Sequence, residues 1–284
     1  MESVNAVVMA GAKIGVREGK QVVSLTGEVQ PAPVGTRSLA VILVNFTDDL
    51  SRPFTVDQLQ NMVFDLSNSD SVASRYQRNS YGRLNLVGRS YDWVTVDPPV
   101  NPDTGQPWTG CDRVTQVTTS AIDAAGAQGF DRYVLVFPNT YNCVYVGVGV
   151  LFGSYSWIWA FPNPHLIFHE LGHNFGLLHA AYLPCPGTPN LSICTPWEYG
   201  DPYDPMGTGD ESMHAANKVH CKWIDSSDVI HIGPETANRA ITLFPTEGNV
   251  GVRDVVIPFN DVRPFPITWS IALPQLCTLL EAVL

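Results

Sequence analysis

Residues 165–180 read HLIFHELGHNFGLLHA, placing four histidines and one glutamate in a run that is otherwise mostly apolar or small. The stretch follows Pro164, which suits the first turn of a helix because the N–H that proline lacks would have no partner there. Residues four apart in a helix lie on one face, one turn distant. His169 and His173 can therefore bind a single ion, with Glu170 projecting beside it.

Gly176 and His179 extend this pattern beyond the helix. Glycine adopts a positive φ without steric cost, so the chain can leave the helix at Gly176 and fold His179 back as a third ligand. Three protein nitrogens leave the fourth position of a tetrahedral zinc ion open for water, as a catalytic site requires. The alternative is an ordinary amphipathic helix with packed histidines. We disfavour it because five specified residues occur at the required spacing.

His165 also lies four residues before His169, but it does not fit the same ion. Along a straight helix His165 and His173 are about 12 Å apart, whereas two ligands of one zinc ion can be at most about 4 Å apart. A pair formed by His165 and His169 alone would lack a nearby third ligand. We interpret His165 as a first-turn residue near the site without a direct chemical role.

The segments around the histidine stretch predict a mixed α/β, or α+β, sheet with crossover helices. Continuous apolar runs indicate buried strands, helical patterns follow Thr55 and Ser71, and glycines in the strand at 143–153 allow close approach of another backbone. The expected strands are 38–46, 83–89, 90–96 after a turn, 132–138, 143–153 and 154–161, and the expected helices are 56–64, 72–82, 112–129 and the histidine helix.

Three regions are expected along the chain. Residues 1–35 form an N-terminal segment that ends in a proline-rich linker, 36–225 form the main domain, and 226–284 form a small β-rich appendage, either whole or cut short. The apolar carboxyl end, 267–284, is interrupted by proline and charge and is marginal in length for a membrane span. We expect a buried strand and tail there and disfavour association with a membrane; the alternative is a membrane anchor or a cleaved anchoring signal.

Composition narrows the class of protein. The 284 residues are 45% hydrophobic and 15% charged, which is typical of a globular protein, and the net charge of −11 argues against nucleic acid as a partner. The six cysteines contain no CxxC pair, so disulfides in an oxidising compartment are favoured, with Cys185–Cys194 the first candidate pair. This favours a secreted protein, although residues 1–20 do not resemble a signal peptide.

The motif HELGHNFGLLH resembles the zinc signature of metzincin endopeptidases, and a second element of that superfamily follows downstream. Residues 198–207, EYGDPYDPMG, are similar to the methionine turn, in which Met206 would form an apolar floor beneath the metal without coordinating it. The alternative is an ordinary core methionine. Among metzincins the resemblance is to the gametolysin-like peptidases, over roughly residues 36–225. Thr208 stands where many metzincins have a tyrosine, so no tyrosine role is carried over.

The resemblance implies a metzincin-like fold with an active-site helix, one catalytic Zn²⁺ and a protein or peptide substrate. Glu170 would act as general base toward a zinc-activated water. In metzincins the substrate pairs with a sheet edge upstream of the metal helix, and our candidate edge strand carries Val144, Val146 and Val148; an interior strand is the alternative. The acidic residues Asp201, Asp204, Asp210 and Glu211 are candidates for a Ca²⁺ site or a solvated loop.

The predicted function is therefore that of a zinc-dependent endopeptidase acting on extracellular, cell-wall or matrix proteins, and we expect a monomer. The alternative is a catalytically silent zinc-binding adhesion or binding module on the same fold; the presence of Glu170 argues against it. A zinc hydrolase of another class, such as an aminopeptidase, shares HExxH but would not require His179 or Met206.

Overall fold

The computed structural model describes residues 12–17, 20–25, 32–108, 110–138, 145–159, 162–182, 184, 195–210, 212–232, 240–257 and 267–269. The chain divides into two compact units, each described here on its own. The first unit comprises Met1–Pro31, Gly35–Tyr76 and Asn85–Gly176, and the second comprises Ala32–Val34, Gln77–Leu84 and Leu177–Leu284. The three-part division expected from the sequence stays a prediction.

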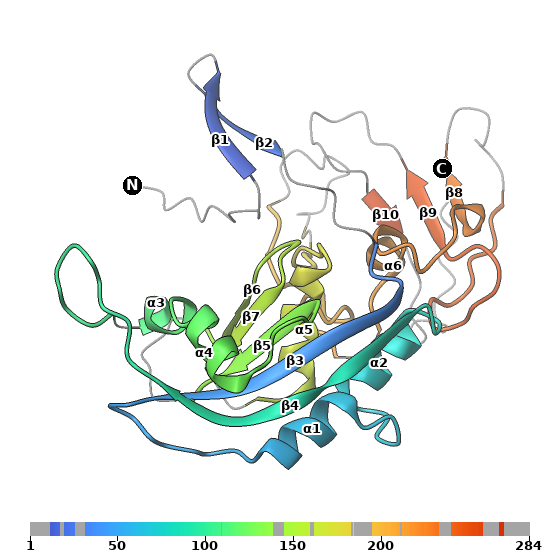
Figure 1. Ribbon diagram of the computed structural model, residues 1–284. Coiled ribbons are helices and arrows are strands. Elements are labelled where there is room, and N and C mark those ends of the chain that lie inside the picture. Colours follow the sequence, from blue (N-terminus) through green and yellow to red (C-terminus); the bar gives the residue numbers. More distant parts are fainter. Residues whose placement is uncertain are drawn as a thin grey trace. The chain divides into compact units, whose positions relative to one another are not determined.

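A five-stranded sheet is the centre of the first unit (Figure 1). The strands are β3 (Gly35–Phe46), β4 (Leu84–Val96), β5 (Arg132–Val136), β6 (Gly147–Gly149) and β7 (Tyr155–Ile158). Their order in the sheet is β4-β3-β5-β7-β6. β3, β5 and β7 are parallel, whereas β6 is antiparallel to β7. The mixed sheet predicted from the apolar runs is confirmed.

Helices cover both faces of this sheet. Trp157 on β7 donates from its ring N–H to the hydroxyl of Thr118, the first residue of helix α4 (Thr118–Ala125), at 2.9 Å. The preceding residue, Ser156, donates instead to the carbonyl of Glu170 on helix α5 (Pro164–Asn174), at 3.3 Å. Successive strand side chains point to opposite faces. Helices α4 and α5 therefore lie on opposite faces of β7.

The apolar core on the α4 side follows this alternation. Every second residue of β3 contributes to it, together with side chains of β5, β7 and α4. Its fully buried members include Ala40, Ile42, Val44, Phe46, Ala121, Leu135 and Phe137. Burying such side chains is the dominant stabilising term in folding, which explains why these strands read as nearly continuous apolar runs.

The first two helices begin where the sequence predicts. Helix α1 (Val56–Phe64) has Thr55 as its N-cap, and the Thr55 and Gln58 side chains bond each other's backbone N–H in a capping box. Helix α2 (Val72–Asn79) follows Ser71, whose hydroxyl accepts from the N–H of Ser74. The polar starts of both helices are thus confirmed.

Two local predictions are wrong. Residues 83–96 do not form two strands with a turn between them but one strand, β4, in which Gly88 has a φ of +156°. A Cβ atom there would lie 1.9 Å from the Leu39 carbonyl oxygen, so this glycine serves close strand packing and not a turn. The helix expected over 112–129 is divided into α3 (Gly110–Thr115) and α4. A glycine ends α4 as expected, but it is Gly126, with φ +61°, three residues before the predicted end.

The second unit contains a small three-stranded sheet in which β9 is central. Its strands are β8 (Val229–His231), β9 (Asp254–Ile257) and β10 (Ile267–Trp269), and the helical pieces nearby in sequence are α6 (Ala215–His220) and a 3₁₀ turn at Ser226–Asp228. The described residues of the region expected to be β-rich, 226–284, thus contain three short strands. β1 (Ala12–Arg17) and β2 (Lys20–Leu25) form a separate antiparallel pair.

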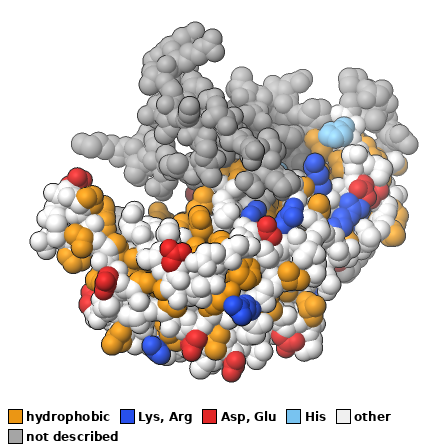
Figure 2. Space-filling view, viewed as in Figure 1, with side chains coloured by type: hydrophobic (Ala, Val, Ile, Leu, Met, Phe, Trp, Pro, Cys, Tyr) orange, Lys and Arg blue, Asp and Glu red, His pale blue; other side chains and the backbone are white. Residues whose placement is uncertain are grey.

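Within the described residues, none of the helices is both long and apolar enough to cross a bilayer. One face of the molecule is drawn in Figure 2, where small hydrophobic groups reach the surface between polar side chains. Neither positive nor negative side chains cover a broad area of the face that is drawn. Scattered apolar groups of this kind are normal on a folded protein.

Candidate metal centre

Helix α5 carries the first part of the predicted site. Asn163 caps it by accepting from the N–H of Leu166 at 2.9 Å, and Pro164 occupies its first turn, as expected. Asn174 fixes the other end of the helix by donating to the carbonyls of Val150 and Tyr155 at 2.9 and 3.0 Å. The helix is therefore held against β6 and β7 by polar contacts as well as by apolar packing.

Gly176 turns the chain out of α5. Its φ is +89°, in the left-handed region that glycine adopts readily, and its N–H donates to the His173 carbonyl at 2.9 Å. A Cβ atom at this position would lie 2.0 Å from the ring of Phe152. Both the backbone conformation and the local packing thus require glycine, and the turn leads the chain directly to His179.

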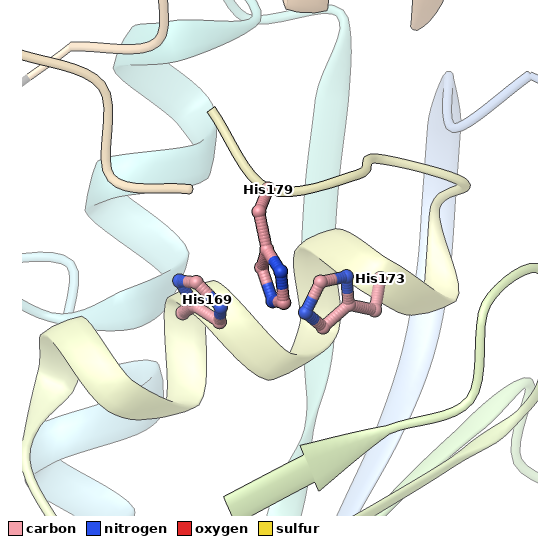
Figure 3. A group of neighbouring side chains, drawn as sticks. All are labelled: His169, His173 and His179. Atoms are coloured by element: carbon pink, nitrogen blue, oxygen red, sulfur yellow. The ribbon is translucent and has the colours of Figure 1, made fainter. Parts of the chain in front are cut away.

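The three predicted ligands come together. His169 and His173 project from α5, and His179 reaches toward them from the segment after the helix (Figure 3). One nitrogen from each ring can be chosen such that all three lie within 4.8 Å of one another. Two zinc ligands lie up to about 4 Å apart, so only a small adjustment is needed for the three rings to bind one ion. His165 is not part of this group.

Three imidazoles are a suitable donor set for zinc, because neutral histidine nitrogen is one of its usual ligands. His169 is buried, and the rings of His169 and His173 meet edge to face with centroids 4.9 Å apart. Tyr76 supports this part of the helix by donating its hydroxyl to the carbonyl of Phe168 at 2.7 Å. The residues present therefore fit a catalytic zinc ion with an open coordination position.

Glu170 is buried beside these ligands on the same helix. Burial raises the pKa of its carboxyl group from 4.5 to about 8, and a hydrogen bond from the backbone N–H of Gly149 acts in the opposite direction. Without a nearby cation the side chain is thus protonated at neutral pH. A bound cation would favour the carboxylate and lower this pKa.

Strand β6 approaches Glu170 closely at two glycines. A Cβ atom at Gly147 would lie 2.8 Å from the Glu170 carboxylate oxygen Oε1, and one at Gly149 would lie 2.2 Å from the Glu170 backbone oxygen. The sequence predicted that these glycines permit close approach of another backbone. The structure identifies that backbone as helix α5.

Met206 lies in the second unit and is completely buried. Its carbonyl accepts from the N–H of Ala180, the residue after His179, at 2.9 Å, and its N–H donates to the Asp204 carboxylate at 2.7 Å. Backbone bonds thus tie the turn around Met206 to the segment that carries the third histidine. Its role as an apolar floor beneath the metal stays a prediction.

Two of the acidic residues predicted to bind calcium accept hydrogen bonds from N–H groups of the protein. Asp201 accepts from the backbone N–H groups of Tyr203 and Asp204 at 2.9 and 3.3 Å. Asp204 also accepts from His214 and Asn217. Such bonds stabilise a turn, and a calcium ion would have to compete with them. Glu211 lies outside the described residues.

The cysteine predictions fall mostly outside the described structure. Cys185 and Cys194, the candidate pair, are not among the described residues, nor are Cys143 and Cys277. Cys221 is a buried free thiol, and burial raises its pKa well above the usual range. A protonated and inaccessible thiol of this kind is inert, so Cys221 has no chemical role at the site.

The pattern search missed two side chains that contact His179. The Nδ1 atom of His179 lies 2.6 Å from Oε1 of Glu198, and the ring of Tyr199 lies against the histidine ring with centroids 3.7 Å apart. Both belong to the segment 198–207, in which only the methionine and the aspartates were considered. The carboxylate and the aromatic residue at the start of that segment were the sequence features that could have indicated this contact.

Comparison with known proteins gives a match to a family model. No curated protein matches the chain. A protein-family model, described as Gametolysin peptidase M11, matches residues 37–242. This range includes His169 and His173 of helix α5, the following His179, and the turn around Met206. The resemblance to gametolysin-like peptidases seen in the sequence is confirmed, and the chain belongs to this family of metallopeptidases.

Proposed function

We propose that this chain is a zinc-dependent endopeptidase that hydrolyses peptide bonds in extracellular, cell-wall or matrix proteins. The observation that carries the proposal is the three-histidine group with Glu170 on the same helix. Membership of a metallopeptidase family supports the reaction class. The substrate class comes from the family resemblance, and secretion, disulfides and a monomeric state belong to the same proposal.

His169, His173 and His179 would hold the ion. When bound, the ion supplies positive charge that acidifies a water molecule and polarises the scissile carbonyl. Glu170 would accept a proton from the attacking water on a carboxylate oxygen and would deliver it to the amine that leaves when the peptide C–N bond breaks. The N–H of Gly149 holds the carboxylate, and the buried surroundings strengthen its electrostatic interactions.

The substrate would bind along β6, which is the last strand in the described sheet order. Val146 is exposed just before this strand and Val148 within it is half-buried, whereas Val144 lies outside the described residues. An extended peptide could add to the sheet by backbone hydrogen bonds, with alternate side chains entering pockets. Because Gly149 of β6 bonds Glu170, a peptide aligned on this strand would lie close to the general base.

The test compares the wild type with Glu170→Gln on casein and on a quenched peptide, with zinc content measured in both. We expect about one zinc in each protein and a loss of activity of about 10²- to 10⁴-fold in the variant. If both proteins bind zinc and neither cleaves a substrate, the silent binding module is the better interpretation. A separate experiment tests the predicted calcium site. If the site binds Ca²⁺, adding Ca²⁺ to the chelator-treated protein should raise its unfolding temperature.

A further inference from the structure

The turn at residues 197–200 contacts one metal-binding histidine from two directions. The Oε1 atom of Glu198 lies 2.6 Å from the Nδ1 atom of His179, and the ring of Tyr199 packs against the same imidazole, with 34° between the two ring planes. We propose that Glu198 and Tyr199 are positioning residues that fix the tautomer and orientation of His179 and thereby raise the zinc affinity of the site. This inference rests on the proposed zinc function.

The hydrogen bond determines which nitrogen of His179 is available. An ionised carboxylate can only accept, so the Nδ1 atom of His179 must carry the hydrogen that lies between it and Glu198. The lone pair of the neutral ring is then on Nε2, which is the atom left to bind a metal. A carboxylate partner also makes the imidazole a more basic ligand. Glu198 is not a member of the three-histidine group, so it acts through His179.

Backbone bonds hold the turn beside His179. Tyr182 and Trp197 exchange two backbone hydrogen bonds of 3.0 and 2.8 Å, and the N–H of Gly200 donates to the Trp197 carbonyl at 3.0 Å. The N–H of Asp201 donates to the carbonyl of Ala180, next to His179, at 3.2 Å. Glu198 is therefore brought to the histidine by a short two-stranded pairing, and it does not depend on a long, mobile side chain alone.

Tyr199 adds a second sign of a constrained site. Its φ is +61°, a left-handed conformation that is unfavourable for a residue with a bulky side chain. Such conformations persist only where the surroundings enforce them, and they are concentrated at functional sites. In this conformation the phenol ring lies on the imidazole of His179 and restricts its rotation.

Exposure sets the expected size of the effect. The Glu198 side chain is 71% exposed, whereas that of His179 is 20% exposed. Water screens a charge as exposed as Glu198. Removal of a residue that orients a metal ligand typically weakens metal affinity about 10- to 100-fold, and we expect about 10-fold here.

The first experiment measures zinc dissociation constants by competition with a chromophoric chelator. Glu198→Ala should bind zinc about 10-fold more weakly than the wild type, and Glu198→Gln, which keeps an oxygen acceptor without charge, should fall between them. Asp103→Asn is the control, because it removes one negative charge from an exposed loop and should leave zinc affinity unchanged. Unfolding temperatures of the metal-free proteins check that all variants fold.

The second experiment reads the tautomer directly in metal-free protein at pH 8, by ¹⁵N NMR of the histidine rings. The His179 signals are assigned from their disappearance in His179→Ala. The wild type should carry the hydrogen on Nδ1, and Glu198→Ala should shift the population toward the Nε2–H tautomer.

Two outcomes overturn the inference: zinc affinity of Glu198→Ala within twofold of the wild type, or an unchanged His179 tautomer. A failure of the proposed function looks different. The wild type itself would then bind no zinc or cleave no substrate, while the tautomer measurement would still test the contact between Glu198 and His179.

Discussion

The three histidines of the candidate metal centre are positioned in two different ways. His169 and His173 are fixed by the regular geometry of a buried helix, which is capped by Asn163 and tied to β6 and β7. His179 lies on an irregular segment and is contacted by Glu198 and Tyr199, about 20 residues further along the chain. A helix positions side chains through its backbone, whereas a loop ligand needs side-chain partners. The sequence motif contains all three histidines, but it does not show the partners that hold His179.

We expect the largest effect on zinc binding when a predicted ligand is removed, either from helix α5 or from the segment that carries His179. His169→Ala and His179→Ala should each weaken zinc binding about a thousandfold, taking one ligand as about a third of a total near 12 kcal/mol, and should abolish peptidase activity. Chelator competition measures zinc binding, and a quenched-peptide assay measures peptidase activity.

The stability of the metal-free proteins should separate His169→Ala from His179→Ala. His169 is buried in the helix, so His169→Ala should lose about 1–3 kcal/mol of unfolding free energy. His179→Ala should lose less, about 0.5–1 kcal/mol, from its contact with Tyr199. Equal losses in denaturant unfolding would contradict the comparison between helix and loop.

The next effect is the pH dependence of the metal-free protein. Burial raises the folded-state pKa of Glu170 from 4.5 to about 8, so its contribution to stability is fully present below pH 4.5 and is lost as the pH rises toward about 8. Glu170→Gln cannot ionise, and its stability advantage over the wild type should grow across this range to a few kcal/mol.

Thermal unfolding of both metal-free proteins between pH 4 and 9 measures this difference. A difference that stays constant with pH would show that Glu170 ionises as easily in the folded state as in the unfolded one. Adding zinc should reduce the difference at high pH, because a nearby cation favours the carboxylate.

A smaller effect is expected at the contact between β6 and α5. Gly149→Ala places a methyl group where only 2.2 Å separates it from the Glu170 backbone oxygen, and the forced shift should cost about 1–3 kcal/mol and lower activity. Gly248→Ala is the matched control, since its Cβ would meet no atom closer than 3.5 Å. Similar unfolding temperatures for the two variants would argue against close packing at β6.

We expect the smallest effect from changing Tyr199, whose ring packs against the imidazole of His179. Tyr199→Phe keeps the aromatic contact and should bind zinc as the wild type does, whereas Tyr199→Ala should bind about threefold more weakly because the contact is worth about 0.5–1 kcal/mol. Chelator competition resolves a threefold change. A loss of affinity in Tyr199→Phe would mean that the phenol hydroxyl, and not the ring, is the important group.

The sequence by itself predicted the three-histidine group and the position of Glu170, because both depend on spacing. The repeat of four residues between His169 and His173, the position of Glu170 and the positive φ required at Gly176 are local properties of a helix and its end. The apolar runs of β3 and β5 likewise specified buried strands, since burial on both faces leaves no polar alternation.

Only the tertiary structure decided how these parts support one another. It joined residues 83–96 into one strand because Gly88 passes the Leu39 carbonyl, and it assigned the glycines of β6 to the packing of Glu170. It also brought Glu198 and Tyr199 to His179 through the backbone pairing of Tyr182 with Trp197. Such contacts join residues that are distant in sequence, and no local spacing encodes them.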